Sequence, residues 1–387
     1  MTVPDAAIES AFAPFREEGR ALLPEAAAVL DAHTHLGLDE DGQSLTVEAL
    51  VGALDEVGPD ARACTFPLHD PDRHPGYRVP NDRVLAWAAE ADGRLIPYCR
   101  LDPAEDPVAE AERCLARGAR GIKLHPRAQA FEFGIAAADS IFACARDAGV
   151  PILIHAGRGM APMDALADIA LRFPEVPLVL AHAGIAGQGM FASRLNGHPR
   201  VVYDTSTLSP FDVIELFARV PAERIVFASD IPYGRPVLAL YQALRIARHV
   251  AGLDDDEVRM LVGGTMDALV DGGSTPEPRA PRVPEVRPAV GRLVRAAVYL
   301  HSAFASMLAG DGARDPARAL PWVAMARTVC RDPEPGPAGD ALERIDASLD
   351  AAERLLLAGG RAAWPAVGLI HATMVFAATE PPVVDGP

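Results

Sequence analysis

Short apolar runs alternate with segments of helical periodicity between residue 28 and about residue 230. Most of the intervening segments carry apolar residues at three- and four-residue steps, which is the spacing of one buried face of a helix. A further helix is expected at about 236–250, after the last apolar run. The pattern therefore predicts eight strands, each followed by a helix. The expected strands cover residues 28–33, 62–66, 95–100, 121–125, 152–155, 178–182, 201–205 and 225–230.

Eight strand–helix units within about 240 residues fit a TIM barrel, or (β/α)8 fold. A doubly wound open sheet is the alternative, because strand–helix alternation alone does not distinguish the two. The polar residues favour the barrel, since five of them stand at the C-terminal ends of five different runs. An open sheet gathers its ligands at one switch point, whereas a closed barrel brings many strand ends to one mouth. These five residues are His33, His125, His155, His182 and Asp230.

The composition changes after Val270, where a segment rich in Pro, Gly and charged residues reads as a linker. Beyond it, helical periodicity predicts two longer helices and two shorter ones, the latter at about 314–330 and 361–378. Together they predict a smaller all-α unit of four helices. We therefore expect a barrel domain at 1–270, a linker at 271–288 and a helical domain of unknown role at 289–387.

The composition and the net charge mainly exclude certain partners and motifs. The formal net charge is −17 and no basic patch occurs, so a nucleic-acid partner is not expected. The five cysteines form no CxxC pair, which argues against a zinc ribbon and suits a reducing cytosol. The N-terminal segment lacks the order of a signal peptide, and the apolar stretch 364–378 is too short to span a bilayer. We expect a cytoplasmic protein without a membrane partner.

The first expected strand ends in Asp31-Ala32-His33-Thr34-His35. Residues two apart in a strand face the same way, so both imidazoles project into the mouth of the expected barrel. Two converging neutral imidazoles suit a borderline metal such as Zn²⁺. An isolated HxH pair is weak evidence, but its place at the end of the first strand makes a metal site the better interpretation.

His155 and His182 end two consecutive strands, and Ala-Gly follows each of them. The small residues let the loops turn sharply and leave room above each histidine. Asp230 ends the last strand, where its simplest alternative role is a helix cap or a turn residue. Several buried imidazoles and a carboxylate on one rim would lack partners unless a metal joins them. A metal site is therefore predicted at this rim.

The sequence resembles the amidohydrolase superfamily at five motifs, and in particular its amidohydrolase-related branch. That branch includes aminocarboxymuconate-semialdehyde decarboxylase and aromatic-acid decarboxylases beside true hydrolases. The resemblance covers the barrel and does not extend past about residue 270. The motifs are DAHTHLG (31–37), GIKLHP (121–126), PILIHAG (151–157), LAHAG around His182 and FASDIPYG (227–234).

The resemblance implies a role for each strand-end residue. His33, His35, His155 and Asp230 would bind a divalent metal, most simply Zn²⁺, with Mn²⁺ or Fe²⁺ as alternatives. Asp230 would also accept a proton from the metal-bound water or the substrate. His182 would be a further ligand or the catalytic acid or base that orients the water. The metal would lower the pKa of that water to about 7.

Lys123 lies two residues before His125 and faces the same way. In the two-metal branches of the superfamily, a lysine on this strand is carboxylated and bridges two ions. Unmodified, its ammonium group would bind a substrate carboxylate, and burial would depress its pKa. A lysine that snorkels between helices is the third interpretation. We favour one ion and a substrate role for Lys123 and His125.

Arg100 ends the third strand and Arg158 follows His155 by three residues, so either could bind a carboxylate as a fork. The alternative for both is a loop charge that faces water. His301 and His371 fall in the helical region and are interpreted as core or interface histidines. Weaker candidates on the same rim are His69, His74, Tyr233 and Arg235.

The first hypothesis is a metal-dependent hydrolase that attacks a C–N or C–O bond of a small carboxylated or cyclic substrate. The second is a non-oxidative decarboxylase on the same metal site, and hydration of an enol acid is a third outcome of the same groups. A non-catalytic barrel whose helical domain mediates an interaction is the alternative outside enzymes. A small-molecule substrate is the expected partner. Dimerisation to a homo-oligomer, a lid over the site and docking to a partner are the open roles of the helical domain.

Overall fold

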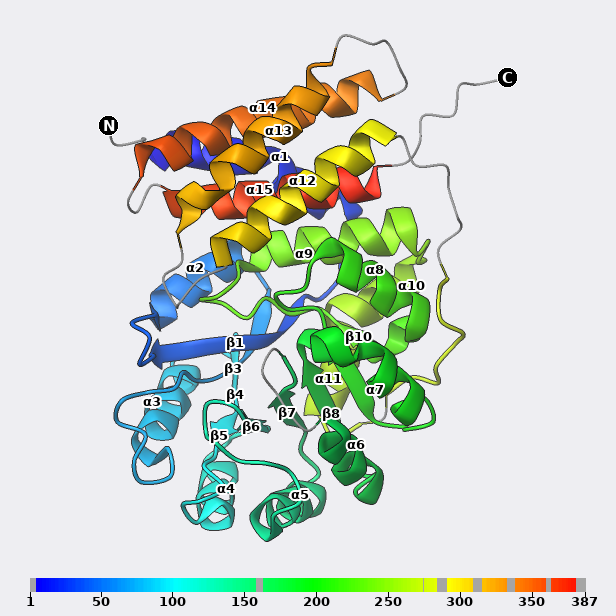
Figure 1. Ribbon diagram of the computed structural model, residues 1–387. Helices are drawn as coiled ribbons and strands as arrows, with labels where there is room; N and C mark the ends of the chain where they lie inside the picture. The colour runs from blue at the N-terminus through cyan, green and yellow to red at the C-terminus, as the bar shows by residue number, and fades with distance from the viewer. Residues whose placement is uncertain are drawn as a thin grey trace.

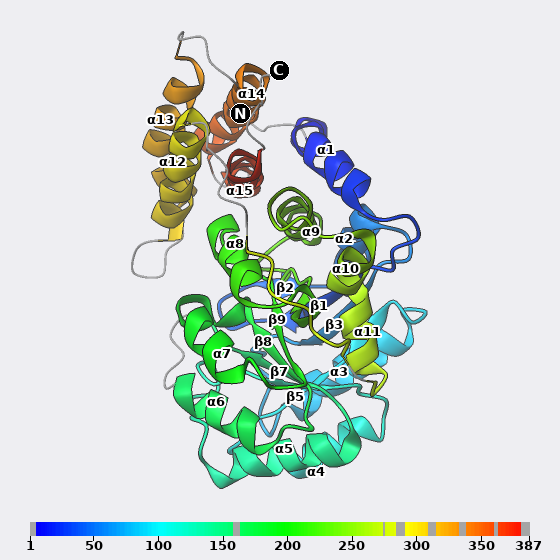
Figure 2. The same ribbon diagram turned by 90° about the vertical axis from the view of Figure 1, so that its right-hand side faces the viewer.

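The structure of the protein, a computed structural model, describes residues 5–157, 163–273, 275–283, 291–308, 315–332, 338–359 and 363–380. Figure 1 and Figure 2 show a body of strands and helices covered on one side by a group of helices from the C-terminal third. Arg158 lies outside the described residues. Within them, no helix combines the length and apolar character needed to cross a bilayer.

Every one of the eight expected strands contains strand structure, so the mixed α/β class with a parallel sheet is confirmed. Within the described residues, two hydrogen-bonded sheets run in the orders β2-β1-β3-β4 and β10-β9-β8-β7-β6-β5, and only the short β2 is antiparallel to its neighbour. The strands are β1 Leu30–Leu38, β2 Ser44–Leu45, β3 Arg62–Pro67, β4 Leu95–Pro97, β5 Cys99–Arg100, β6 Ile122–Leu124, β7 Ile152–His155, β8 Leu178–Ala181, β9 Val201–Asp204 and β10 Ile225–Val226.

Backbone hydrogen bonds link the two sheets on both sides. The third expected strand is divided at Tyr98, whose N–H donates to the carbonyl of Thr65 at 2.8 Å. The next residue, Cys99, donates to the carbonyl of Gly121 at 3.0 Å, so this strand contacts β3 first and β6 afterwards. On the other side, Ala32 of β1 donates to the carbonyl of Phe227, just after β10, at 3.0 Å.

The helices after the strands lie close to their predicted positions. Local capping and burial explain them, as in α8, where Ser209 and Asp212 form a capping box and Val213, Leu216 and Phe217 are buried. The helices are α2 Val47–Val57, α3 Arg78–Ala89, α4 Pro107–Leu115, α5 Ala136–Ala148, α6 Met163–Arg172, α7 Gln188–Leu195, α8 Pro210–Arg219 and α9 Pro236–Arg245, which continues as a π-helical turn Ile246–Val250.

Other helical segments were not predicted. They are α1 Asp5–Leu22, α10 Asp255–Arg259, the π-helical turn Met260–Gly264, α11 Thr265–Val270 and the short helices η1 His182–Gly187 and η2 Ala222–Arg224.

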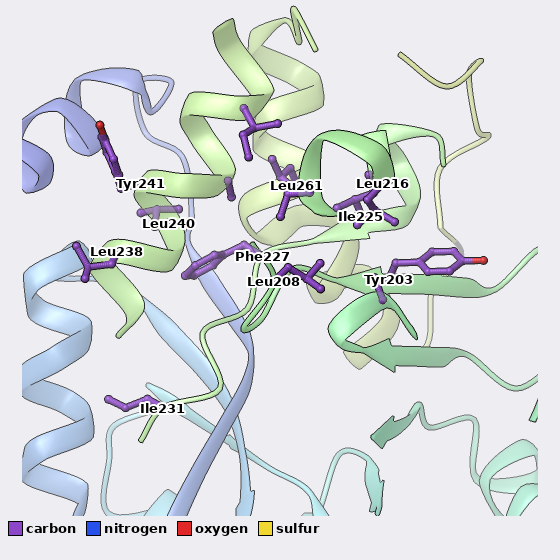
Figure 3. Close-up of a cluster of buried hydrophobic side chains, with 14 of the residues drawn as sticks. Tyr203, Leu208, Leu216, Ile225, Phe227, Ile231, Leu238, Leu240, Tyr241 and Leu261 are labelled. Atoms are coloured by element: carbon purple, nitrogen blue, oxygen red, sulfur yellow. The ribbon is translucent and has the colours of Figure 1, made fainter. Parts of the chain in front are cut away.

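The core follows the alternation of side chains along the strands. In β7, Ile152 and Ile154 pack in the larger cluster beneath the helices, while Leu153 faces a second, separate cluster. This second cluster collects side chains from most of the strands and from α11, on the face of the strands opposite the larger cluster. Figure 3 shows part of the larger cluster, around Phe227. Its neighbours in the view include Leu240 of α9 and Leu261 of the π-helical turn Met260–Gly264. Tight packing on both faces fixes the ends of the strands.

The four helices expected in the C-terminal third are present: α12 Gly291–Leu308, α13 Leu320–Cys330, preceded by a short 3-10 helix Pro316–Ala319, α14 Gly339–Ala358 and α15 Trp364–Thr379. They pack on the strand-bearing body through α15, which contacts α9, α8 and α1. The approach is close at Gly368, where an added Cβ atom would lie 2.9 Å from Leu238 of α9 and 3.2 Å from Phe12 of α1.

A buried arginine joins helices α1, α9 and α15. The side chain of Arg245 in α9 is 3% exposed and forms ion pairs with Glu18 of α1 and, at 2.8 Å, with Glu380 after α15. Its Nε donates to the hydroxyl of Thr379 at 2.7 Å. Removing one partner of such a buried network leaves a charge without compensation, so the network fixes how these helices meet.

Candidate metal centre

The end of β1 and the residue after β10 bring three polar side chains together. His33 and His35 are 1% and 4% exposed, and their ring centroids lie 5.2 Å apart. The backbone N–H of Asp230 donates to the carbonyl of His33 at 2.8 Å, which holds Asp230 beside them. Oδ1 of Asp230 lies 3.1 Å from Nε2 of His33 and 3.0 Å from Nε2 of His35. Three donor atoms from two strand ends therefore converge on one point.

This donor set fits a divalent metal ion. Ligand atoms around a tetrahedral Zn²⁺ are about 3.3 Å apart, given metal–ligand bonds near 2.0–2.1 Å, and the separations here are similar. Burial lowers the pKa of His35 to about 3, so this ring is neutral. Burial opposes ionisation of Asp230, but His33 and His35 outweigh it and hold its pKa well below the usual range. Neutral imidazole and carboxylate are the forms that bind metals.

Asp204, which the sequence analysis did not single out, positions His33. It is fully buried at the end of β9, and its Oδ2 accepts a hydrogen bond from Nδ1 of His33 at 2.8 Å. Its Oδ1 accepts from the backbone N–H of His182 at 2.7 Å and from the hydroxyl of Ser206 at 2.6 Å. Burial raises the pKa of Asp204, but His33 prevails and sets it at about 2. A carboxylate on Nδ1 leaves Nε2 of His33 free for a metal.

The rule of polar strand-end residues could have found Asp204, since it is the second-last residue of the expected strand 201–205 and the last residue of β9. We expect Asp204→Asn to weaken metal binding about ten- to a hundredfold, as loss of a carboxylate behind a metal-binding histidine does elsewhere. An amide has one acceptor oxygen, so it cannot accept from both His33 and His182. Titration of Zn²⁺ against a competing chelator measures the effect, and Asp168→Asn, an exposed carboxylate, is the control. Equal affinities in the two variants would contradict this role.

His155 and His182 lie beside this group. Nε2 of His182 is 3.1 Å from Nδ1 of His155, and the hydroxyl of Thr207 lies 2.9 Å from Nδ1 of His182. An added Cβ atom at Gly157 would lie 2.8 Å from the ring of His182 and 2.9 Å from that of His155, so a glycine is needed there. His155 also stacks on His125, with ring centroids 3.9 Å apart.

Two groups of donor atoms among the described residues lie close enough to hold an ion. One comprises His33, His35 and Asp230; the other comprises His33, His182 and Asp204. Asp204 of the second group lies at Nδ1 of His33, whereas Asp230 of the first group lies at Nε2, so the first group is the candidate centre. His155 is in neither group and reaches this centre through His182. Its Nε2 is buried without a hydrogen-bond partner in the described chain, which leaves it available to a ligand.

Lys123 stands at the floor of the site. It is fully buried, and its Nζ lies 3.2 Å from Nε2 of His33 and 4.5 Å above the ring of Phe66. Burial lowers its pKa to about 7, against the attraction of Asp230. The interpretation of Lys123 as a lysine that snorkels between helices is therefore wrong, because its ammonium group is fully buried beside His33 in the site.

Arg100 is also buried, at 1% exposure, so the interpretation as a water-facing loop charge is wrong. Asn81 holds the backbone of Arg100 by accepting from its N–H at 2.9 Å. The guanidinium donates to the carbonyl of Pro67 at 3.2 Å and lies 5.0 Å from the ring of Tyr77. Within the described residues it has no carboxylate partner. A buried cation without a counterion is suited to binding an anion.

A cavity of about 520 Å³ opens over these residues. The first donor group, His155 and His182 line it with Lys123, Arg100 and His125. Two of the weaker candidates, His69 and Tyr233, also line it. Two others do not: His74 pairs with Glu105 at 2.8 Å, and Arg235 faces Glu56 at 3.5 Å. The cavity also has residues that sequence reasoning missed, which are Asp39, Asp41, Arg127, Ala128, Ile185, Thr207 and Phe304.

Comparison with known families shows to which family the chain belongs. Residues 31–269 match the model of the amidohydrolase family Amidohydro_2, and the chain belongs to this family. The protein is therefore an enzyme of the metal-dependent amidohydrolase superfamily, which confirms the resemblance found in the sequence. The matched region ends before the four C-terminal helices. Comparison with curated proteins gives no significant match.

Solved structures share the fold at low sequence identity. A protein described as amidohydrolase II superposes with a TM-score of 0.52 at 15% identity, covering 63% of this chain and 100% of that one. The 2,6-dihydroxybenzoate decarboxylase from Rhizobium gives 0.50 at 14% identity, covering 63% and 98%. At these identities the likeness establishes the fold of the strand-bearing body alone.

Proposed function

We propose that the protein is a metal-dependent decarboxylase of a small carboxylic acid, built on a closed (β/α)8 barrel. Closure is supported by the hydrogen bonds that link the two sheets on both sides and by the second cluster of side chains. His33, His35 and Asp230 would hold a Zn²⁺, Mn²⁺ or Fe²⁺ ion, with His155 as a further ligand. When bound, the ion would polarise a substrate oxygen.

The observation that carries this proposal is the buried guanidinium of Arg100 on the cavity wall without a carboxylate partner in the described chain. A substrate carboxylate would supply the missing charge through paired hydrogen bonds. Lys123 and His125 line the same cavity and would add to the attraction of an anion. Burial lowers the pKa of Lys123 to about 7, and a carboxylate bound beside it would favour the protonated ammonium form.

Proton movement falls to Asp230 and His182. Asp230 is held as a carboxylate, so it would accept a proton from an acidic group of the substrate and return it to the carbon that loses CO₂. In that step the bond to the carboxylate breaks, its electron pair remains on carbon, and the proton replaces CO₂. His182 would be held in one orientation by the neighbouring hydroxyls of Ser206 and Thr207, which lie 2.9 Å from its Nδ1.

Hydrolysis of a C–N or C–O bond is the second candidate. It is favoured if Lys123 is carboxylated and bridges two ions, because a shared hydroxide is a strong nucleophile. In the described chain Asp204 of the second donor group holds Nδ1 of His33 and does not line the cavity, so one group faces the cavity, which is why we favour one ion and decarboxylation. Membership of an enzyme family removes the support for a purely non-catalytic barrel.

The test is a screen of metal-loaded protein against small unsaturated and aromatic acids, 2,6-dihydroxybenzoate among them, with CO₂ release and hydrolysis followed in parallel. We expect metal-dependent CO₂ release and about one ion per chain. Arg100→Met should raise KM at least about tenfold, as loss of a charge-assisted hydrogen bond does, while the exposed control Arg120→Met should not. Hydrolysis without CO₂ release, with two ions bound after addition of bicarbonate, would establish the second candidate instead.

A further inference from the structure

We propose that Phe304, on helix α12 of the C-terminal helical unit, is a specificity-determining wall of the substrate cavity. This inference rests on the proposed function, since it concerns what binds beyond the carboxylate. The helical unit lies outside the family match at residues 31–269. The chain would thus complete its active site with a residue that the family's own domain does not contain.

The position of α12 makes this contribution direct. Phe304 is half-buried and lines the cavity together with the metal-binding candidates. In Figure 1 the C-terminal end of α12 and the arrowhead of β1 lie on the same, left-hand side of the molecule. A helix from the last third of the chain therefore reaches the mouth of the strand-bearing body.

One ring contact of Phe304 itself and one of its neighbour His301 hold this part of α12 in place. Its ring packs against His371 of α15, with centroids 5.6 Å apart, and α15 is itself fixed on α9 and α1. Three residues before Phe304, the ring of His301 meets Phe211 of α8 at 5.7 Å, edge to face. His301 is exposed to solvent, so it is not a core histidine. It lies where α12 contacts α8 of the strand-bearing body, which agrees with its interpretation as an interface histidine. The aromatic wall is therefore anchored from both sides.

The chemistry of the cavity gives the wall its role. Most of the lining side chains are charged or polar, whereas Phe304 and Ile185 are large and apolar. Ile185 has φ of 40°, a conformation that β-branched residues avoid, so the surrounding packing must impose its position. A substrate that places its carboxylate on Arg100 would meet apolar contacts wherever it extends to Phe304. Acids with a bulky apolar body would gain affinity that short acids do not.

Calorimetric titration of the metal-loaded protein with acetate and with benzoate tests the inference. Phe304→Ala should weaken benzoate binding about tenfold, as the loss of about 55 Å² of apolar contact predicts, and change acetate binding less than about twofold. Phe304→Leu keeps the apolar packing against His371 and should give a smaller loss. Val298→Ala, on the same helix and 51% exposed, is the matched control and should bind both acids as the wild type does.

The outcomes separate this inference from the proposed function. Benzoate binding that is equal in wild type, Phe304→Ala and Phe304→Leu overturns the role of Phe304 and leaves the metal site and Arg100 untouched. Wild-type protein that holds its metal but binds neither acid contradicts both the carboxylate site and the inference. Equal losses for acetate and benzoate would show that Phe304 supports the fold of the cavity and does not select among acids, which also overturns the proposal.

Discussion

A double variant, His33→Ala with His35→Ala, is expected to bind less than a tenth of the metal that the wild type holds. The two imidazoles supply two of the three donor atoms that converge beside β1. Among the described residues, the remaining Asp230, His155 and His182 form no group of donor atoms close enough to hold a borderline ion against water. Elemental analysis of protein purified without chelator measures the effect. About one ion per chain is expected for the wild type.

The fold should survive this double substitution. Residues at the C-terminal ends of barrel strands serve function more than stability. Asp204 would lose His33 as a partner, but the backbone N–H groups of His182 and Ser206 still donate to it. His198→Ala provides a control, because this histidine is also buried but bonds to the carbonyl of Ala170 outside the site. Wild-type protein that is active and free of metal would refute the assignment.

Asp230→Asn is expected to lower kcat at least about a hundredfold, equivalent to about 3 kcal/mol of transition-state stabilisation. The amide keeps the shape and a weak ligand oxygen, but it cannot accept and return a proton. The rate loss should therefore exceed any loss of metal, which is measured on the same samples. Asp271→Asn, an exposed carboxylate paired with Arg120, is the control. A variant that keeps its metal and at least a third of the wild-type rate would exclude Asp230 as the proton carrier.

The strand ends show how far the sequence could predict this site. A polar residue that follows an apolar run of strand length lies at the mouth of the strand-bearing body, and His33, His155, His182 and Asp230 all lie there. Asp204 obeys the same rule and was missed, because a carboxylate one residue before an expected strand end has no motif of its own. Buried Arg100 could not be told from a loop charge, since its burial depends on packing by Asn81 and Tyr77 from a separate helix.

Long-range packing explains what the sequence could not predict. Helix α1 contains Pro14, follows no strand and is fixed through Phe12 and Phe15 against distant helices, so local periodicity does not reveal its place. The four C-terminal helices were predictable from their own apolar spacing. Their placement was not, because the residues of α15 and α9 that meet are more than a hundred positions apart in the chain. The position of Phe304 in the cavity depends on that placement.

The network around Arg245 has a consequence for biosynthesis. It joins Glu18, made early by the ribosome, to Thr379 and Glu380, made some 360 residues later. Until α15 emerges, the surfaces of α1 and α9 that it covers, including Phe12 and Leu238, stay open to water and to other nascent chains. The strand-bearing body can be fully translated while this apolar surface of α1 and α9 remains uncovered. Chaperones that recognise exposed apolar helices would be needed most during that interval.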